Sequence, residues 1–427
     1  MLASLLFGLA PALRATRQAP GAAVSLGARG VTGDRRRMVL RRVLVVGQMA
    51  LSVVLLIGAM LFVGTLRNLT GGDLGFSDRN IMVVDLDLRP ARVGADARLA
   101  YELDIVDRLS TLTGVAGAGA AVITPISGSG WNDAISIDGR QQEGYPCANR
   151  VSPGFFDALR IPFVTGRNFD ARDRVGATAK AIVNEAFRDR YFGGAGPVGR
   201  HFRIDVGPGV PDPSYEIVGV VRNTKYRDLR DELGPLMYLA AAQEPEPSPF
   251  LMVLVRAHGD PDGVRPAIAD AIKAIHPSIV VSYTVMETQV RNTLLRERLT
   301  AALSTGFALL AVVLAAVGLY GLMAYSVARR RNEIGIRVAL GATRANIVGM
   351  IVRETTWLVV AGVALGVGGA MYGARAVQAM LFGLTGSEPV VLGSGALLLA
   401  VVAGLAAIVP ASRAARLQPT TALRDQA

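Results

Sequence analysis

The side chains best arranged for chemistry lie in the short segment 329–342, which reads RRRNEIGIRVALGA. Glu333 and Arg337 stand four residues apart, the spacing that pairs opposite charges on one face of a helix. The same spacing separates two pairs of apolar residues, Ile334 with Val338 and Ile336 with Leu340. An amphipathic helix of this kind is suited to docking against another surface, and it carries no group that would make or break a covalent bond.

Residues typical of catalysis or metal binding are sparse in the 427-residue chain. Cys147 is the single cysteine, so no intrachain disulfide is possible, and His201, His258 and His276 show no metal-ligand spacing. The chain contains no G-x-x-x-x-G-K-[ST] motif and therefore does not bind ATP through a P-loop. No nucleophile–base pair or carboxylate dyad stands out. We therefore predict a protein that is not an enzyme and that needs no cofactor or metal.

The docking segment directly follows an apolar run. Residues 300–327 carry no charge and are long enough to cross a bilayer. The arginines at 329–331 mark the cytoplasmic end of this run, because basic residues concentrate on that side of a membrane. Three further runs have the composition of membrane spans: 43–66, 355–372 and 390–409. The basic flanks of all four spans agree on one membrane topology. This topology predicts that both ends of the chain are cytoplasmic and that residues 67–299 are extracytoplasmic.

On spacing alone, the segment 329–342 also fits a membrane-surface loop whose apolar flank rests on lipid headgroups. Its residues favour a more specific reading. The run 332–342, NEIGIRVALGA, closely resembles the signature of the FtsX/MacB-type permease family. In that family the equivalent segment is the coupling helix that docks on a partner ABC-type ATPase. The resemblance implies an ATPase-coupling role for six residues: Glu333, Ile334, Gly335, Arg337, Gly341 and Ala342.

The region between the first two spans extends this resemblance. Four phrases, at 151–156, 164–169, 181–185 and 215–221, look like the periplasmic core domain of MacB-like permeases. The resemblance then covers nearly everything after residue 38. It implies a MacB-like periplasmic core domain at 67–299 and an FtsX-like permease domain at 300–427, with its coupling helix at 329–342.

Residues 67–299 are numerous enough to form their own core. Alternating and helical patterns predict two β-α-β units, which suggests a split ferredoxin-like part at about 76–126 and 250–290. In the first unit, the expected core face of the helix consists of Leu99, Leu103, Val106 and Leu109. A strand-rich inserted subdomain is expected at about 130–245. The predicted fold is thus an α-helical membrane protein with four transmembrane helices and a large α+β extracytoplasmic domain inserted between the first and second.

The formal net charge of +11 is concentrated beside the predicted spans. Eight arginines and one acidic residue precede residue 43, whereas 67–298 carries 27 basic and 29 acidic residues. The charge therefore reflects membrane topology and contact with lipids, and it does not indicate a nucleic-acid-binding surface.

The first residues resemble the last ones. Segments 11–20 and 410–419 are identical at six of ten positions, and each follows an apolar run. We interpret 1–20 as the tail of a preceding transmembrane unit and 21–42 as a basic cytoplasmic linker. On this interpretation the chain is the C-terminal half of a duplicated permease.

Three functions fit these features. The resemblance implies the permease subunit of an ABC-type mechanotransmission system, which couples a cytoplasmic ATPase to the extracytoplasmic domain for export or extraction of an envelope substrate. The four spans are uncharged apart from Arg375 near the outer end of the third, just past residue 372, so an ion or proton path is not indicated. The alternative is a signalling or scaffold protein that regulates a cell-envelope partner without transport. A membrane-anchored enzyme is disfavoured by the lack of a catalytic constellation.

The expected location is the bacterial cytoplasmic (inner) membrane. The expected partners are an ABC-type ATPase in trans, a second permease unit in a homo- or pseudo-dimer, a periplasmic adaptor and membrane lipids, with no nucleic acid.

Overall fold

The computed structural model describes residues 30–207, 211–330, 333–334, 336–337, 340, 342–384 and 388–414. The proposed tail at 1–20 lies outside the described residues, as do Gly335 and Gly341 of the coupling segment. The chain divides into two compact units, Leu66–Arg298 and a second unit formed by the residues before and after it.

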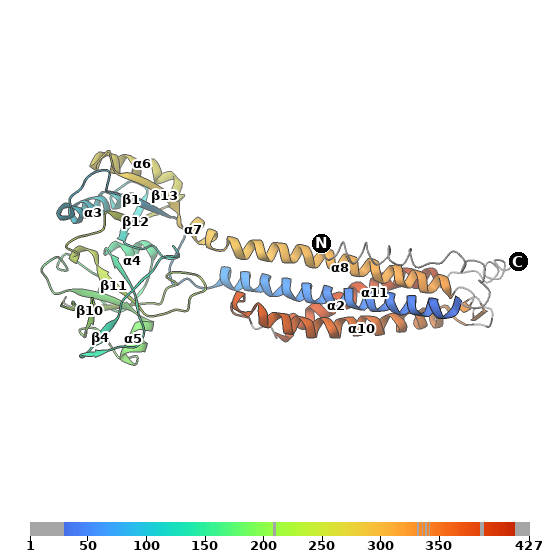
Figure 1. The fold of residues 1–427 in the computed structure, drawn as a ribbon. Helices are drawn as coiled ribbons and strands as arrows, with labels where there is room; N and C mark the ends of the chain where they lie inside the picture. The colour runs from blue at the N-terminus through green and yellow to red at the C-terminus, as the bar shows by residue number, and fades with distance from the viewer. Residues whose placement is uncertain are drawn as a thin grey trace, which may run out of the picture. The chain divides into compact units, whose positions relative to one another are not determined.

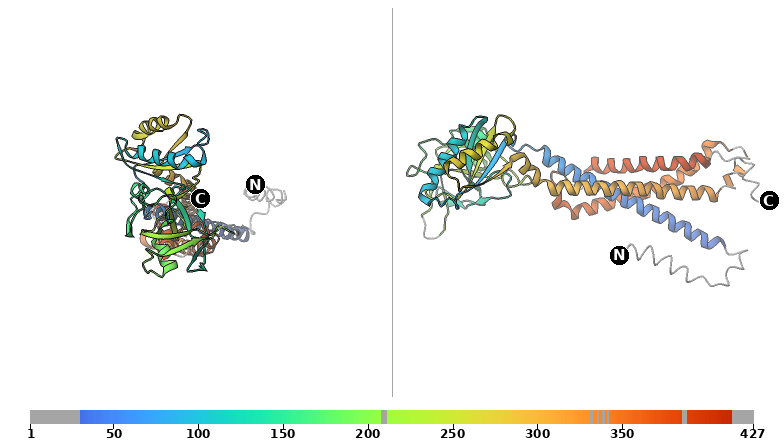
Figure 2. Two further views of the ribbon diagram at one scale, coloured as in Figure 1. Left: turned by 90° about the vertical axis from the view of Figure 1, so that its left-hand side faces the viewer. Right: turned by 90° about the horizontal axis from the view of Figure 1, so that it is seen from above.

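The second unit, which we call the membrane unit, contains four helices that are long and apolar enough to cross a membrane. This finding confirms the predicted spans within the described residues. They are α2 (Gly30–Gly71), α8 (Leu295–Arg329), α10 (Arg344–Ala376) and α11 (Pro389–Ala414). Each helix runs beyond the apolar segment expected for it, because the backbone hydrogen bonds of a helix do not depend on apolar side chains. A short 3-10 turn, η3 (Gln378–Met380), follows α10. Figure 2 shows α2 crossing its neighbours at an angle.

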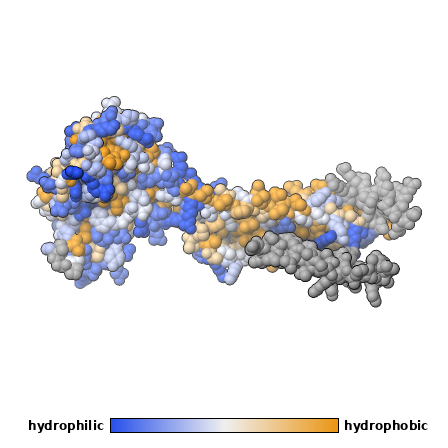
Figure 3. Space-filling view, turned by 45° about the horizontal axis from the view of Figure 1, so that its top comes forward, coloured by the Kyte–Doolittle hydropathy of each residue, from blue (hydrophilic) through white to orange (hydrophobic). Residues whose placement is uncertain are grey.

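Small residues bring these helices close together. A Cβ atom on Gly366 of α10 would lie 2.5 Å from the Cβ of Val53 on α2, and Gly362 makes a similar approach one turn earlier. Such residues allow two helix backbones to pack closely in a membrane. On the α8 side, the Ser52 hydroxyl donates to the carbonyl of Ala311 at 2.9 Å. Apolar side chains cover much of the helix surface visible in Figure 3.

We call Leu66–Arg298 the extracytoplasmic unit, after its predicted location. This unit begins and ends in a ferredoxin-like part. Its elements are β1 (Ile81–Asp87), α3 (Ala95–Ser110), β2 (Val115–Ala121), β12 (Phe250–Ala257), α6 (Pro261–Ile275) and β13 (Val280–Val285). The strand order is β13-β1-β12-β2 with antiparallel neighbours, so each β-α-β unit is split by a strand of the other. Helices α3 and α6 lie on the same side of these strands (Figure 1). Helix α7 (Met286–Thr293) follows β13.

The face that α3 turns toward the core differs from the expected one. The buried residues of α3 are Glu102, Ile105 and Leu109, whereas Leu103 is 48% exposed. The prediction that Leu103 lies on the core face is therefore wrong. Apolar residues occupy more than one side of α3, and the packing selects the stripe through Ile105 and Leu109. That stripe places a carboxylate, Glu102, in a core position.

The inserted subdomain continues the same sheet in the order β2-β6-β11-β8-β10-β9-β4-β5, with β3 paired to β6 and β7 to β10. Its strands are β3 (Trp131–Asn132), β4 (Ile135–Ile137), β5 (Arg140–Gln141), β6 (Cys147–Val151), β7 (Phe163–Gly166), β8 (Lys180–Asn184), β9 (His201–Ile204), β10 (Ser214–Val221) and β11 (Leu236–Ala240). Its helices are α4 (Gly154–Leu159), α5 (Glu185–Phe192) and the 3-10 turn η2 (Ala241–Gln243).

Strands β2 and β6 share a single residue pair, Ala121 with Val151. Two buried side chains strengthen this junction. The Ser152 hydroxyl accepts from the backbone N–H of Ala120 at 2.8 Å. The Asn149 amide accepts from the N–H of Ile123 at 3.2 Å and donates to the carbonyl of the same residue at 2.8 Å. These side-chain hydrogen bonds supplement two backbone bonds across the junction, from Val122 N–H to the carbonyl of Arg150 and from Ser152 N–H to the carbonyl of Ala120, both 3.0 Å.

Candidate functional site

The coupling segment joins the end of α8 to the start of α10. Its described residues Glu333, Ile334, Ile336 and Arg337 are helical. The guanidinium of Arg337 lies 2.7 Å from the carboxylate of Glu333, which is the ion pair expected from their spacing. The backbone N–H of Ala342 donates to the carbonyl of Arg337, five residues earlier, at 2.9 Å. A bond of this span is typical of helix C-termini.

Helix α10 then begins at a capped residue. The Thr343 side chain accepts from the backbone N–H of Asn346, so Thr343 is the N-cap of α10. The coupling segment is therefore a separate helical piece and does not merge with α10.

The apolar flank of the coupling segment splits between two surroundings. Ile334 is 1% exposed and belongs to the apolar core of the membrane unit, together with Ile347 and Ile351 of α10. Ile336 is 53% exposed and Leu340 is 82% exposed. The expectation of one continuous apolar flank is therefore wrong for the described residues, because Ile334 points into the helix bundle. Val338 lies outside the described residues.

We define the docking face as the exposed side chains Glu333, Ile336, Arg337 and Leu340. Both members of the Glu333–Arg337 pair are half-exposed, so they are available to a partner as well as to each other. An apolar pair beside a charge pair is a common composition for a protein contact. Of the six residues expected to couple to an ATPase, Glu333 and Arg337 lie on this face and Ile334 lies beneath it.

A carboxylate that sequence reasoning missed ties the cytoplasmic ends of three helices together. Glu354 of α10 forms ion pairs with Arg42 of α2 and, at 2.9 Å, with Arg330 at the end of α8. We call this arrangement the Glu354 clamp. The sequence signal is a single acidic residue just inside an apolar helix that two basic segments flank. Nearby, the guanidinium of Arg41 lies 4.1 Å from the ring centre of Tyr325.

The extracytoplasmic unit has its own anchor points for the two chain segments that enter and leave it. On the entering segment, the Asp73 carboxylate pairs with Arg222 at 2.7 Å, and the carbonyl of Leu74 accepts from the N–H of Lys225 at 2.8 Å. On the leaving segment, Glu297 pairs with Arg230 at 3.0 Å. Residues 222–230 of the inserted subdomain therefore hold both segments.

A further anchor is a buried arginine. The guanidinium of Arg256 on β12 donates to three backbone carbonyls: those of Ser77 at 3.0 Å, Arg79 at 2.8 Å and Ala158 at 2.5 Å. Burial lowers the pKa of Arg256. Its charge is satisfied by carbonyl dipoles, and it links the segment before β1 to helix α4.

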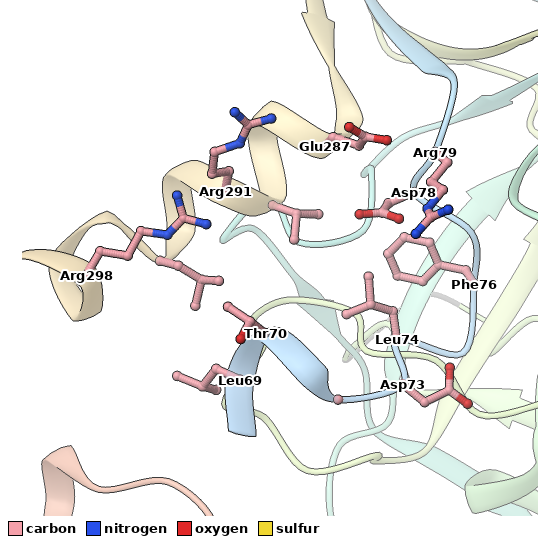
Figure 4. Close-up of a pocket in the computed structure, with 13 residues that line it drawn as sticks. Leu69, Thr70, Asp73, Leu74, Phe76, Asp78, Arg79, Glu287, Arg291 and Arg298 are labelled. Carbon is pink, nitrogen blue, oxygen red and sulfur yellow. The ribbon is translucent and has the colours of Figure 1, made fainter. Parts of the chain in front are cut away.

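A cavity of about 730 Å³ lies between these entering and leaving segments (Figure 4). Its charged lining combines Asp78 and Arg79 on one side with Glu287, Arg291 and Arg298 on the other. Both signs of charge are present and the cavity is open, so it is suited to water and ions more than to an apolar ligand.

The described residues show no arrangement typical of catalysis. They contain no group of three or more histidine, cysteine, aspartate or glutamate side chains placed to hold a metal ion. Burial raises the pKa of the Cys147 thiol, which disfavours the reactive thiolate.

Comparison with known proteins agrees with this architecture. Residues 43–271 match the model of the MacB-like periplasmic core domain, and residues 305–419 match that of the FtsX-like permease C-terminal domain.

Individual relatives are similar over about two thirds of this chain. The pyoverdine export ATP-binding/permease protein PvdT of Pseudomonas aeruginosa is 26% identical over 64% of this chain and 41% of its own length. The uncharacterized ABC transporter permease YknZ of Bacillus subtilis is 25% identical over 66% of this chain and 71% of its own. The chain thus spans well under half of PvdT. The crystal structure of the periplasmic region of MacB from Actinobacillus actinomycetemcomitans aligns with 52% of this chain and 94% of its own, with 11% identity and a TM-score of 0.37.

Four membrane-length helices and a MacB-like periplasmic core domain make this a multi-pass protein of the bacterial inner membrane, with residues 67–299 outside the cytoplasm. The two matched domains cover most of the sequence, with the periplasmic core domain before the permease domain. The chain therefore belongs to the FtsX/MacB-like family of ABC transporter permeases.

Proposed function

We propose that this chain is the permease subunit of an ABC-type mechanotransmission system. A separate cytoplasmic ATPase binds the docking face, and its ATP-driven motion is passed to the extracytoplasmic domain, where it serves export or extraction of an envelope substrate. The observation that carries the proposal is the docking face itself, an exposed apolar and charged surface on a helix whose inner side is fixed in the membrane unit.

The proposal assigns ATP hydrolysis to an ATPase outside this sequence. The relative PvdT is named an ATP-binding/permease protein, whereas the present sequence contains no P-loop motif. Its similarity to PvdT covers 41% of that protein. The proposal therefore places ATP binding outside residues 1–427, on an ABC-type ATPase.

Transmission is supported by the way the coupling segment is held. Ile334 is packed among Ile347 and Ile351, so displacement of the segment displaces α10 with it. The Glu354 clamp connects α10 to the ends of α2 and α8. Helices α2 and α8 each continue without a break to the boundary of the extracytoplasmic unit. A push on the docking face is thereby shared among helices and is not absorbed in a loose loop.

The decisive experiment replaces the exposed apolar residues of the docking face. Ile336→Glu and Leu340→Glu should each reduce co-purification of the partner ABC-type ATPase at least tenfold, because a charge buried in an apolar contact is strongly unfavourable. Neither change should disturb folding, since both side chains are exposed. Leu233→Glu is the matched control: it alters an exposed leucine of the extracytoplasmic unit in the same way.

Glu333→Lys separates this proposal from a membrane-surface loop. It reverses a charge on the docking face and breaks the pair with Arg337, so ATPase binding should weaken. A loop that only rests on anionic lipid would bind vesicles more strongly after the same change. Wild-type ATPase binding by all three docking-face variants would refute the proposed coupling role.

The dimer of permease units and the periplasmic adaptor stay predictions. A signalling protein would use the same coupling, so the readout on the far side of the membrane distinguishes it. Loss of substrate export in the docking-face variants supports transport, whereas intact export with loss of envelope-partner regulation supports signalling.

A further inference from the structure

A second cavity, of about 350 Å³, lies where the ferredoxin-like part meets the inserted subdomain. Part of its lining comes from α3, β2 and β12 of the ferredoxin-like part. The rest includes residues of β3, β6 and the connector at 244–248. This volume is in the range of small-molecule sites, which favour such junctions. Most of its lining is apolar, with Trp131 and Phe250 as the aromatic members.

One carboxylate in this lining stands out. Glu102 occupies the core-facing stripe of α3, is only 9% exposed, and lines the cavity. Within the part of the chain that the structure describes, its carboxylate has neither a hydrogen bond nor an ion pair. Burial raises its pKa to about 7. A buried carboxyl group without a partner is costly to the fold, so its position calls for a ligand or a proton.

Two nearby arginines, Arg150 and Arg98, make their hydrogen bonds and ion pairs with groups other than Glu102. Arg150 pairs with Glu244 at 2.6 Å and lies 5.0 Å from the ring centre of Trp131. Arg98, one turn before Glu102 on α3, donates through Nη1 to the carbonyl of Pro247 at 3.2 Å, while its buried Nε has no hydrogen-bond partner among the described residues. The cavity therefore presents a carboxylate to which neither arginine is bonded. Glu246, also in the lining, adds negative charge at the exposed connector.

We propose that this cavity binds a small organic amine with an apolar body. The ammonium group pairs with Glu102, and the apolar body lies in the part of the cavity lined by Trp131 and Phe250. A divalent metal fits less well, because the described residues provide no cluster of three metal-ligating groups. The proposal stands on the cavity alone and does not depend on ATPase coupling.

The test uses the full chain in detergent with Trp357→Phe, which leaves Trp131 as the single tryptophan of the two in the sequence. The probes are phenethylamine, 2-phenylethanol and phenylacetate, which share a ring and differ in charge. Phenethylamine should change Trp131 fluorescence saturably at about pH 8, where Glu102 is ionised and the amine is protonated. Phenylethanol should bind at least tenfold more weakly, and phenylacetate should not bind.

Glu102→Gln should weaken phenethylamine binding at least tenfold while keeping the side-chain shape. Asp104→Asn is the matched control on the same helix: its exposed carboxylate pairs with Arg108 at 2.9 Å and does not line the cavity, so binding should be unchanged. The proposal is overturned by the absence of saturable change up to about 10 mM phenethylamine, a range that covers even weak millimolar ligands. An equal response to phenylethanol also overturns it, as does unchanged affinity in Glu102→Gln. The wild-type probe series decides the matter even if that variant folds poorly.

Discussion

Replacing Glu102 by glutamine should stabilise the extracytoplasmic domain, and the gain should depend on pH. Burial raises the pKa of Glu102 from 4.5 to about 7 in the folded domain. Between these values the folded domain holds a proton that the unfolded chain has lost. Wild-type stability therefore falls as the pH rises from about 4.5 to about 7, and it stays at the lower level above that. Glutamine does not ionise and escapes this loss.

The size of the effect follows from the same two values. The gap between 4.5 and about 7 corresponds to about 3 kcal/mol of unfolding free energy at about pH 8. For a folded unit of roughly 230 residues, that is a rise in Tm of roughly 6–12 °C. At about pH 4 both the folded and the unfolded glutamate are protonated, so the variant and the wild type should differ by less than about 0.5 kcal/mol.

The assay is denaturant unfolding of the full chain in detergent, followed through Trp131 in the Trp357→Phe background at about pH 4 and about pH 8. Asp104→Asn serves as the control, because an exposed ion pair contributes less than about 1 kcal/mol. Equal stabilisation by Glu102→Gln at both pH values, or no stabilisation at about pH 8, would show that the folded domain does not keep Glu102 neutral and would refute the reasoning.

Three further predictions follow from the structure. In a chain carrying Cys147→Ser, a membrane-impermeant thiol reagent should label Tyr145→Cys in intact cells and Ile336→Cys only after permeabilisation; the reverse pattern would invert the topology. Glu354→Gln should lower the thermal stability of the solubilised chain by about 1 kcal/mol at low salt and by less at high salt, since it removes a partly exposed carboxylate shared by two arginines. Asn149→Ala should destabilise the extracytoplasmic domain by about 1–3 kcal/mol in denaturant unfolding, because it leaves the partly buried backbone N–H and carbonyl of Ile123 without their side-chain partner, and a loss under about 0.5 kcal/mol would argue against that bridge.

The membrane topology was predictable because it depends on local features. An uncharged run of sufficient length identifies a membrane span, and the arginines beside each run indicate its direction across the membrane. The spacing of Glu333 and Arg337 likewise predicted their ion pair, because four residues make about one helical turn. The two β-α-β units were recognisable from patterns within each unit.

Features that depend on tertiary packing were not predictable in the same way. Leu103 looked like a core residue of α3, but the sheet packs against the stripe that contains Glu102. Ile334 and Ile336 are equally apolar, yet one is buried and the other exposed, because the direction of the coupling segment depends on the helices beneath it. Periodicity identifies a helix but does not say which of several apolar sides finds a partner.

The Glu354 clamp illustrates the limit for the candidate site. Arg42 and Glu354 are 312 positions apart in sequence, and no local pattern connects them. The Glu102 cavity is similar, since its lining comes from both parts of the extracytoplasmic unit. A single sequence shows a charge in an unusual place, but the groups that do or do not neutralise it become visible only in the fold.

The strand order of the ferredoxin-like part has a consequence for how the protein is made. Strand β1 is among the first segments of its domain to leave the membrane, yet both of its partners, β12 and β13, follow the whole inserted subdomain. While the chain is being translocated, the largely apolar strand β1 therefore stays unpaired until residues 250–285 have crossed the membrane. Such long-range pairing is slow, and an unpaired apolar strand invites aggregation. A chain whose translocation stalls before β12 would consequently expose β1 as an unfinished edge, open to periplasmic chaperones and proteases.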